Sequence, residues 1–108
     1  MKKLISIGEA LIDFIPTESG KKIKQVDGFK PAVGGAPANV CAAFTKLGGE
    51  SKMITQLGED PFGDKIIDEF RKYNIEGSNW YNQQIYFNQI KQYQKRMKAK
   101  QIALSLYQ

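Results

Sequence analysis

The chain has 108 residues, of which 42% are hydrophobic, and its formal net charge is +5. This length suffices for one small domain and is too short for separate nucleotide and substrate lobes. One cysteine and no histidine exclude an intramolecular disulfide and the usual zinc sites. No apolar run approaches the roughly 20 residues of a membrane helix. We therefore expect no membrane span and a cytoplasmic protein.

The charge is distributed unevenly along the chain. Residues 1–79 contain 11 basic and 11 acidic residues, whereas residues 80–108 contain five basic residues and no acidic one. All ten glycines and all four prolines precede residue 79, and seven glutamines lie after it. We therefore divide the chain into a first part, residues 1–79, and a basic tail rich in Gln, Lys and Tyr, residues 80–108.

The first third of the chain reads as two strands and a flap. The apolar run 4–7 ends at a glycine, which is the pattern of a buried strand, and the apolar run 11–15 continues until Pro16 interrupts it. Residues 17–29 are polar and contain two glycines. We expect them to form a hairpin or flap that projects from the main body.

A helix is expected after the glycine pair at positions 34 and 35. Pro37 suits the first helical turn, and Gly48 and Gly49 end the helix. The expected apolar stripe, at helical spacing, comprises Val40, Ala43, Phe44 and Leu47. Cys41 lies in the same region, has no base near it in the sequence, and is expected to be a small core residue.

A second strand and helix follow. Met53, Ile54 and Leu57 predict a strand that ends at Gly58. Asp60 is expected to cap a helix that begins at Pro61 and ends near Asn74 and Gly77. Its expected apolar face comprises Phe62, Ile66, Ile67 and Phe70. The order strand, flap, helix, strand, helix predicts an α/β fold with a parallel sheet and crossover helices.

Two features could bind a polar ligand. Gly34 and Gly35 precede a helix, so the backbone could approach a ligand there, and Asn39 could both donate to and accept from a hydroxyl group. The alternative is a helix start that needs two unusual backbone conformations. Asp13 lies among apolar residues, on the face opposite Ile12 by alternation; its carboxylate either accepts hydrogen bonds from a ligand or lies on a solvated strand face.

Three segments carry a resemblance to a known family: MKKLISIGEALIDFIP, GGAPANVCAAFTKLGG and LGEDPFGDKIIDEFRKYNIEG. In this order and at this spacing they resemble the N-terminal part of ribokinase-like (PfkB) sugar kinases, and the form GGAPANV is most similar to bacterial fructokinases. The resemblance implies a partial ribokinase-like fold with part of a β lid. It also implies the transfer of phosphate from Mg-ATP to D-fructose, giving fructose 6-phosphate and ADP.

The same resemblance implies which residues hold the sugar: Asp13, Gly34, Gly35 and Asn39. Gly58, Asp60 and Gly63 match a pattern whose role is more structural. The family's catalytic Gly-Ala-Gly-Asp loop and its ATP site have no counterpart here, since no Gly or Asp follows Gly77. We expect a truncated kinase that retains part of the sugar site, has no catalytic or metal-binding residues, binds ATP and Mg²⁺ poorly, and is inactive alone.

The tail allows two interpretations. Its abrupt change of composition at residue 80 suggests out-of-frame translation after a frameshift. Alternatively, Tyr86, Ile90, Tyr93 and Met97, interspersed with lysines and an arginine, predict a basic amphipathic helix that binds nucleic acid or an anionic membrane. A truncated sheet would expose apolar strands and free edges, so we also expect self-association unless the tail helix covers the sheet.

Overall fold

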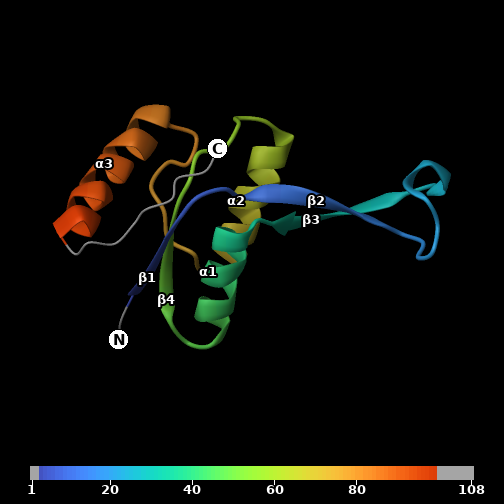
Figure 1. The fold of residues 1–108 in the computed structure, drawn as a ribbon, viewed down its shortest axis with the longest axis horizontal. Helices are drawn as coiled ribbons and strands as arrows, with labels where there is room; N and C mark the ends of the chain where they lie inside the picture. Colours follow the sequence, from blue (N-terminus) through green and yellow to red (C-terminus); the bar gives the residue numbers. More distant parts are fainter. Residues whose placement is uncertain (1–2, 100–108) are drawn as a thin grey trace.

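The computed structural model describes residues 3–99 and shows an α/β body from which a two-stranded ribbon projects (Figure 1). In chain order the elements are β1 (Lys3–Ile7), β2 (Leu11–Pro16), a short 3₁₀ turn (Ile23–Gln25), β3 (Phe29–Gly34), α1 (Ala36–Lys46), β4 (Glu50–Ile54), α2 (Pro61–Lys72) and α3 (Gln83–Ala99).

The strands form two separate pairs. β1 and β4 are parallel, with Ile7 opposite Ile54, and α1 crosses between them in the sequence. β2 and β3 are antiparallel and form the ribbon, closed at its outer end by hydrogen bonds from the Thr17 amide and hydroxyl to the Gly28 carbonyl oxygen, both 3.0 Å long. The predicted parallel sheet and projecting flap are therefore confirmed.

α1 buries a different stripe from the one expected. Ala38 and Cys41 are buried, whereas Val40 is 51% exposed and Leu47 is 87% exposed. The cause is close packing on the β1–β4 sheet: the Ser51 hydroxyl donates to the Cys41 carbonyl oxygen at 3.2 Å, a separation that leaves space for small side chains only. Cys41 is thus the small core residue that was expected. The predicted stripe was wrong at Val40, Ala43 and Leu47, which are exposed, and only its Phe44 is partly buried.

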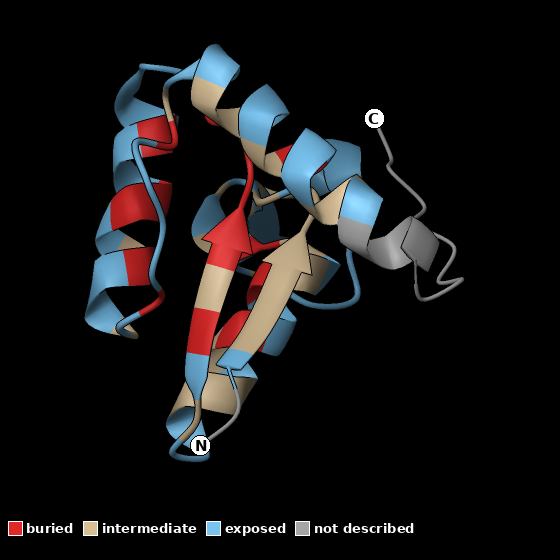
Figure 2. Cartoon of the chain, turned by 90° about the vertical axis from the view of Figure 1, so that its left-hand side faces the viewer, coloured by how far each residue is buried: buried red, intermediate tan, exposed pale blue. Residues whose placement is uncertain are grey.

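The core lies between α1, α2 and β4. Figure 2 shows the buried residues gathered in β4 and on one side of α2. Phe70 contacts the indole of Trp80 edge-on, with a centroid distance of 5.0 Å. The rest of the buried cluster consists of Ala38, Cys41, Met53, Leu57, Ile66, Ile67 and Ile75. Phe62, expected in this face, is 56% exposed; it lies instead against Phe14 of the ribbon, at 6.2 Å between centroids.

The chain leaves α2 through a segment, residues 75–81, that we call the strap. It begins after Asn74, which adopts a left-handed φ of 56°. The strap pairs with β4 at Glu76, whose amide donates to Ser51 O and whose carbonyl oxygen accepts from the Met53 amide, both at 2.9 Å. Beyond the end of β4, the Leu57 amide donates to Trp80 O, also at 2.9 Å. Trp80, the first residue of the predicted tail, is 8% exposed and donates its indole N–H to Met53 O at 3.0 Å.

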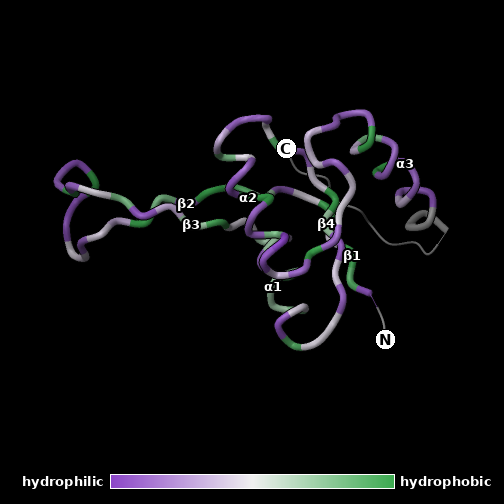
Figure 3. Tube along the Cα trace, turned by 180° about the vertical axis from the view of Figure 1, so that it is seen from behind, coloured by the Kyte–Doolittle hydropathy of each residue, from purple (hydrophilic) through white to green (hydrophobic). Residues whose placement is uncertain are grey.

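The predicted helical tail is confirmed by α3. α1 and α3 lie on opposite sides of the β1–β4 sheet (Figures 1 and 2), and α3 contacts β4. Ile90 is 7% exposed, and Tyr86 and Tyr93 are half-buried; the side chain of Met97 lies outside the described residues. Figure 3 shows that the rest of α3 is mainly hydrophilic. Within residues 3–99, no helix has the combined length and hydrophobicity that crossing a bilayer requires.

The sheet is better covered than a truncated sheet was expected to be. Met53, Ile54 and Leu57 are all buried, so β4 leaves little apolar area exposed. The ribbon differs: Figure 3 shows hydrophobic residues along β2 and β3, and several of these residues remain exposed. The exposed members are Leu11, Phe14, Ile15 and Phe29.

Candidate functional site

The two faces of the ribbon have different surroundings. Ile12 and Val33 are register partners and pack against the core. Asp13 pairs with Ala32, and because side chains alternate along a strand its carboxylate lies on the other face, away from the core. The structure therefore agrees with the alternation expected from the sequence. Asp13 is exposed, and within residues 3–99 nothing donates a hydrogen bond to it.

The Asp13 carboxylate lies directly over Gly34, the last residue of β3. A Cβ atom built at Gly34 would be 3.1 Å from Asp13 Cγ and would overlap its nearer oxygen. Any other residue at this position would have to displace the carboxylate. The glycine at position 34 thus leaves room for the Asp13 carboxylate in its present position.

Gly35 adopts a left-handed backbone conformation, which residues with a side chain rarely adopt. Its φ of 98° lies in the left-handed region, and it is the N-cap residue of α1. A Cβ here would be 2.8 Å from the Glu9 carbonyl oxygen and 3.2 Å from Ala10 Cα. The β1–β2 connection therefore packs against the start of α1. The alternative interpretation, a helix start with two unusual backbone conformations, agrees with the structure at Gly35.

Sequence reasoning missed this connection. Gly8 has a φ of 154°, and a Cβ there would be 2.7 Å from Pro37 Cγ. Gly8 and Gly35 together let two backbone segments meet at the start of α1. The available signal was the glycine that follows the first apolar run, which was interpreted only as a strand end.

Asn39 lies one turn further along α1. Its amide N–H makes a helical hydrogen bond of 2.9 Å to Gly35 O, and its side chain has no partner within the described residues. It borders a cavity of about 340 Å³ between β3, α1 and α2, which Asp13, Gly34 and Gly35 do not line. The structure thus joins three of the four predicted residues and leaves the fourth beside a separate hollow.

The three joined residues, Asp13, Gly34 and Gly35, we call the polar cradle. Its Asp13 carboxylate accepts no hydrogen bond from the described residues, and the space beside the two glycines is filled by that carboxylate at Gly34 and by residues 9 and 10 at Gly35. The first turn of α1 begins beside it, and the positive end of the helix dipole favours oxygen-rich groups. Such a cradle can hold neighbouring hydroxyl groups, since a charged acceptor binds them more strongly than a neutral one.

Gly58, Asp60 and Gly63 have a structural role, as expected. The Gly63 amide donates to Asp60 Oδ1 at 2.8 Å, which caps the first turn of α2. A Cβ at Gly63 would overlap the Gly58 carbonyl oxygen. This close contact fixes the turn between β4 and α2. Within the described part of the chain, no three acidic, cysteine or histidine side chains cluster as a metal site would require.

The fold and this site define a class of α/β proteins in which a β ribbon meets a glycine-rich helix start. The family model for pfkB family carbohydrate kinases matches residues 1–87. The chain therefore belongs to the pfkB family of carbohydrate kinases.

Individual relatives agree with this assignment. Fructokinase-2 of Solanum lycopersicum is 53% identical over 79 residues, which are 71% of this chain and 24% of the relative. Among solved structures, an uncharacterized sugar kinase from Pyrococcus horikoshii in complex with ATP matches with 43% identity and a TM-score of 0.65, covering 71% of this chain and 25% of that one. Halothermothrix orenii fructokinase matches with 31% identity and a TM-score of 0.65, covering 71% and 28%.

The matches are confined to part of each relative. This chain spans only 22% of the length of Probable fructokinase-2 and Probable fructokinase-5 of Arabidopsis thaliana, to which it is 45% and 46% identical. The structural matches cover a similar quarter of each solved kinase. The family match, residues 1–87, includes the ribbon, the polar cradle and the β1–β4 sheet.

Proposed function

We propose that the polar cradle, together with Asn39, binds the hydroxyl groups of a fructose-like sugar as part of a cytoplasmic, ATP-dependent fructokinase. Asp13 accepts hydrogen bonds from two neighbouring hydroxyls, while Gly34 leaves room for its carboxylate and Gly35 brings the β1–β2 connection against the start of α1. The reaction of the whole enzyme transfers a phosphoryl group from ATP to D-fructose, giving fructose 6-phosphate and ADP. Fructokinase relatives at 53% and 31% identity support this choice of sugar.

One observation carries the proposal. The Asp13 carboxylate is exposed, has no partner within residues 3–99, and occupies the space that a side chain at Gly34 would need. No hydrogen bond or ion pair among the described residues therefore uses this carboxylate. Its position is instead useful for a ligand that donates hydrogen bonds to it.

We further propose that these 108 residues do not transfer phosphate by themselves. Phosphoryl transfer depends on positioning and on charges that stabilise the transferring group. The residues described here supply no cluster of carboxylates for Mg²⁺, and the sequence has no Gly-Ala-Gly-Asp loop. The residues present do not fit ATP and Mg²⁺, so these cofactors bind the fragment poorly and no catalytic step is assigned to it.

Fructose titration by isothermal calorimetry or by NMR tests the cradle. We expect weak, saturable binding that Asp13→Asn reduces by about tenfold or more, because a charged acceptor is lost. Asp27→Asn, which removes an exposed carboxylate at the far end of the ribbon, is the matched control and should leave the affinity unchanged. Equal affinities for the wild type and Asp13→Asn would remove the basis of the proposal.

A second variant separates the position of the carboxylate from its charge. Gly34→Ala keeps Asp13 but forces its carboxylate aside. We expect fructose binding to fall by about as much as in Asp13→Asn, with little change in the unfolding transition. A coupled assay with ATP and fructose on the wild-type chain should meanwhile show no turnover above background.

A basic binding module is the second candidate function. Lys91 and Lys95 lie on the solvent side of α3 and border a shallow hollow with Asn88 and Gln92. This arrangement favours RNA over a membrane, because Ile90, on the apolar face that would enter a lipid, is already buried against the body. Binding of the chain to a short RNA should fall steeply with salt if this function is real.

We also propose that the chain self-associates through exposed strand edges. The ribbon presents Phe14, Ile15 and Phe29 to solvent, and its two strands pair only with each other among the described residues. Exposed apolar strands of this kind promote pairing between chains. Analytical ultracentrifugation should show a concentration-dependent increase in mass; a monomer at all concentrations would contradict the proposal.

A further inference from the structure

The outer edge of β1, which faces away from β4, has no strand beside it among residues 3–99. In this part of the chain β1 pairs with β4 alone. The Gly8 amide donates to Ile54 O at 3.2 Å, so this amide points to β4. Backbone groups of a strand point alternately to its two edges, which places the amides of Ile5 and Ile7 at the outer edge. A free edge of this kind is a template for a further strand.

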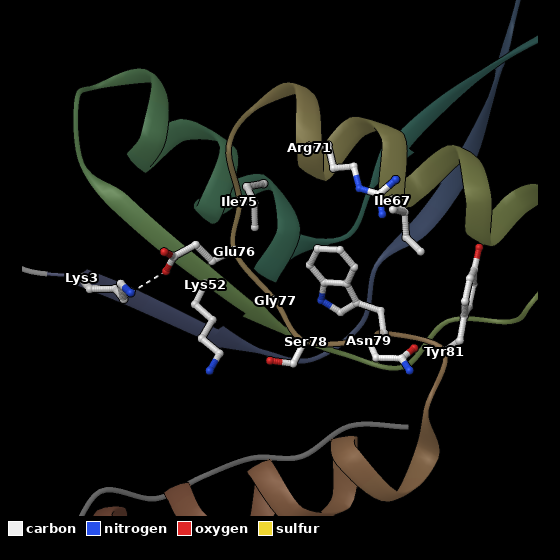
Figure 4. Close-up of a pocket in the computed structure, with 11 residues that line it drawn as sticks. Lys3, Lys52, Ile67, Arg71, Ile75, Glu76, Gly77, Ser78, Asn79 and Tyr81 are labelled. Carbon is white, nitrogen blue, oxygen red and sulfur yellow. Dashed lines mark ion pairs between the residues drawn. The ribbon is translucent and has the colours of Figure 1, made fainter.

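The same strand leaves apolar side chains half-covered on the face of the sheet opposite α1. The Ser51 hydroxyl hydrogen-bonds to α1, so alternation along β4 places Lys52 and Ile54 on the other face. Figure 4 shows the Lys52 side chain pointing to the side of the sheet on which α3 lies. Ile5 and Ile7 are the register partners of Lys52 and Ile54 and share this face. Ile54 is 0% exposed, whereas Ile5 and Ile7 are only half-buried.

α3 brings the chain toward this edge. The strap runs parallel to β4, with Glu76 opposite Lys52, and leads into α3. Figure 2 shows α3 crossing the sheet obliquely, from above β4 toward the β1 side. The pKa of Lys3, raised chiefly by its hydrogen bond to Glu76, is raised further by Tyr93 of α3. The later turns of α3 therefore lie within electrostatic reach of the start of β1.

The positions of the two helices favour a strand at the outer edge of β1. Parallel crossovers are right-handed in nearly all proteins. β1, α1 and β4 form one crossover. A second crossover, from the strap through α3 and back past β4 and β1, would cross the sheet in the opposite direction. Two such crossovers have the same hand when their helices lie on opposite faces, as α1 and α3 do.

The residues that follow α3 in the sequence have the pattern of such a strand. Residues 100–108 lie outside the described part of the structure, and their sequence is KQIALSLYQ. Ile102, Leu104 and Leu106 alternate with smaller or more polar residues, which is the period of a strand with one apolar face. Nine extended residues reach at most about 30 Å. The five residues of β1 span about 16 Å, so this segment is long enough to pair along the whole of β1.

We propose that residues 101–107 of the same chain dock on the outer edge of β1 as a parallel strand, with their apolar side chains toward α3. This strand would accept hydrogen bonds from the free amides of Ile5 and Ile7 and would extend the cover on the α3 face. The basic tail then completes the sheet of a chain that spans only about a quarter of its relatives. Nothing in this docking uses the polar cradle, so the inference does not depend on the proposed function.

Amide hydrogen exchange of the full 108-residue chain, followed residue by residue by NMR, tests this pairing. We call the amides of Ile5 and Ile7 the outer-edge amides. If the edge is free, protection alternates along β1: the Ser6 amide, which points to β4, is protected, and the outer-edge amides exchange fast. With the segment docked, the outer-edge amides should exchange within about tenfold of the rate of Ser6. Their protection should not depend on protein concentration.

Two matched variants assign the protection to the segment. Leu104→Asn/Leu106→Asn removes apolar side chains from its docking face and should speed exchange of the outer-edge amides by about tenfold or more. Ser105→Asn/Tyr107→Asn changes the opposite face of the segment and should leave these amides protected. Fluorescence of the buried Trp80 shows that each variant keeps the core.

Three results would overturn the proposal. The first is alternating protection along β1 in the wild-type chain. The second is equal protection of the outer-edge amides in both double variants, which would mean that α3 alone shields the edge. The third is protection that rises with protein concentration, with NOEs from β1 to residues 101–107 found only between labelled and unlabelled chains in a mixed sample. That result would assign the edge to a second copy of the chain, whereas the same NOEs within one chain support the docking.

Discussion

The β2–β3 ribbon and the core around β4 both carry large apolar side chains, but they place them differently. In the core, Phe70 is 1% exposed and contacts Trp80. In the ribbon, Phe14 is 55% exposed and has one aromatic contact, with Phe62. The core holds the shape of the domain, while the ribbon presents side chains, Asp13 among them, to something outside it. The same residue type therefore has different energetic consequences in the two regions.

The largest expected effect is in the core. Phe70→Ala removes a fully buried ring and should cost about 3–5 kcal/mol, which is comparable to the whole stability of a domain this small. The variant should lose its cooperative unfolding transition. Phe14→Ala, the matched change in the ribbon, should cost about 1 kcal/mol or less. Similar losses for both variants, measured by urea denaturation, would erase the difference between the regions.

The junction of the two regions gives the next effect. Gly35→Ala must adopt a φ of 98° and place a Cβ against the Glu9 carbonyl, at a cost of about 2–4 kcal/mol. Gly48→Ala has a similar φ of 93° but open space around it, so only the cost of about 1–2 kcal/mol for the backbone should appear. If the two glycines prove equally tolerant, the close approach of residues 9 and 10 to α1 is not a constraint.

A smaller effect is expected at the start of α2, which lies beside the ribbon. Asp60→Ala removes the cap on the Gly63 amide and should cost about 1 kcal/mol. Asp68→Ala, an exposed change in the middle of the same helix, is the control and should alter the stability by at most about 0.5 kcal/mol. The difference between the urea midpoints of the two variants measures the contribution of the Asp60 cap to stability.

The smallest effect concerns the contact between the strap and α2. A hydrogen bond to Asp64, with some desolvation, raises the pKa of Tyr81 to about 12 from its ordinary value of 10.0. The unfolded chain therefore releases this proton first, and the folded state loses stability as pH rises from about 10 to about 12. A titration of phenolate absorbance against pH should show one tyrosine that ionises near pH 12. In Asp64→Asn this tyrosine should ionise closer to pH 10. If a tyrosine with this raised pKa persists in Asp64→Asn, the raised pKa does not come from the contact between Tyr81 and Asp64.

The sequence predicted the positions of most helices and strands better than it predicted which of their residues are buried. Strand runs located β1 and β2, and the prolines at the starts of α1 and α2, with the Asp60 cap, located these two helices. β3 was not predicted as a strand, and β4 ends at Ile54, earlier than the predicted strand that ends at Gly58. The buried stripe of α1 was not predictable from hydropathy, because the sheet approaches too closely for anything larger than Ala38 and Cys41. Periodicity records which residues are apolar and does not record how close the neighbouring element lies.

The candidate site was predictable in part. Alternation along β2 placed Asp13 away from Ile12, and the glycine pair marked the helix start. The packing of Glu9 and Ala10 against Gly35, by contrast, depends on the three-dimensional path of the β1–β2 connection. The pairing of Lys3 with Glu76 joins residues distant in the sequence, and no local pattern indicates it.

The boundary at residue 80 stays a prediction. The change in composition there is abrupt, but the family match extends to residue 87 and Trp80 packs in the core. A frameshift near Trp80 can be tested by sequencing the coding region. A continuous reading frame shared with full-length relatives would rule the frameshift out.

The central claim is that the ribbon and the start of α1 form a sugar site. A fructose titration followed by residue-resolved NMR tests it most directly. The account predicts saturable shifts at Asp13, Gly34, Gly35 and Asn39, with no change at the strap. Shifts that never saturate, or that fall on the strap and not on the ribbon, would contradict it.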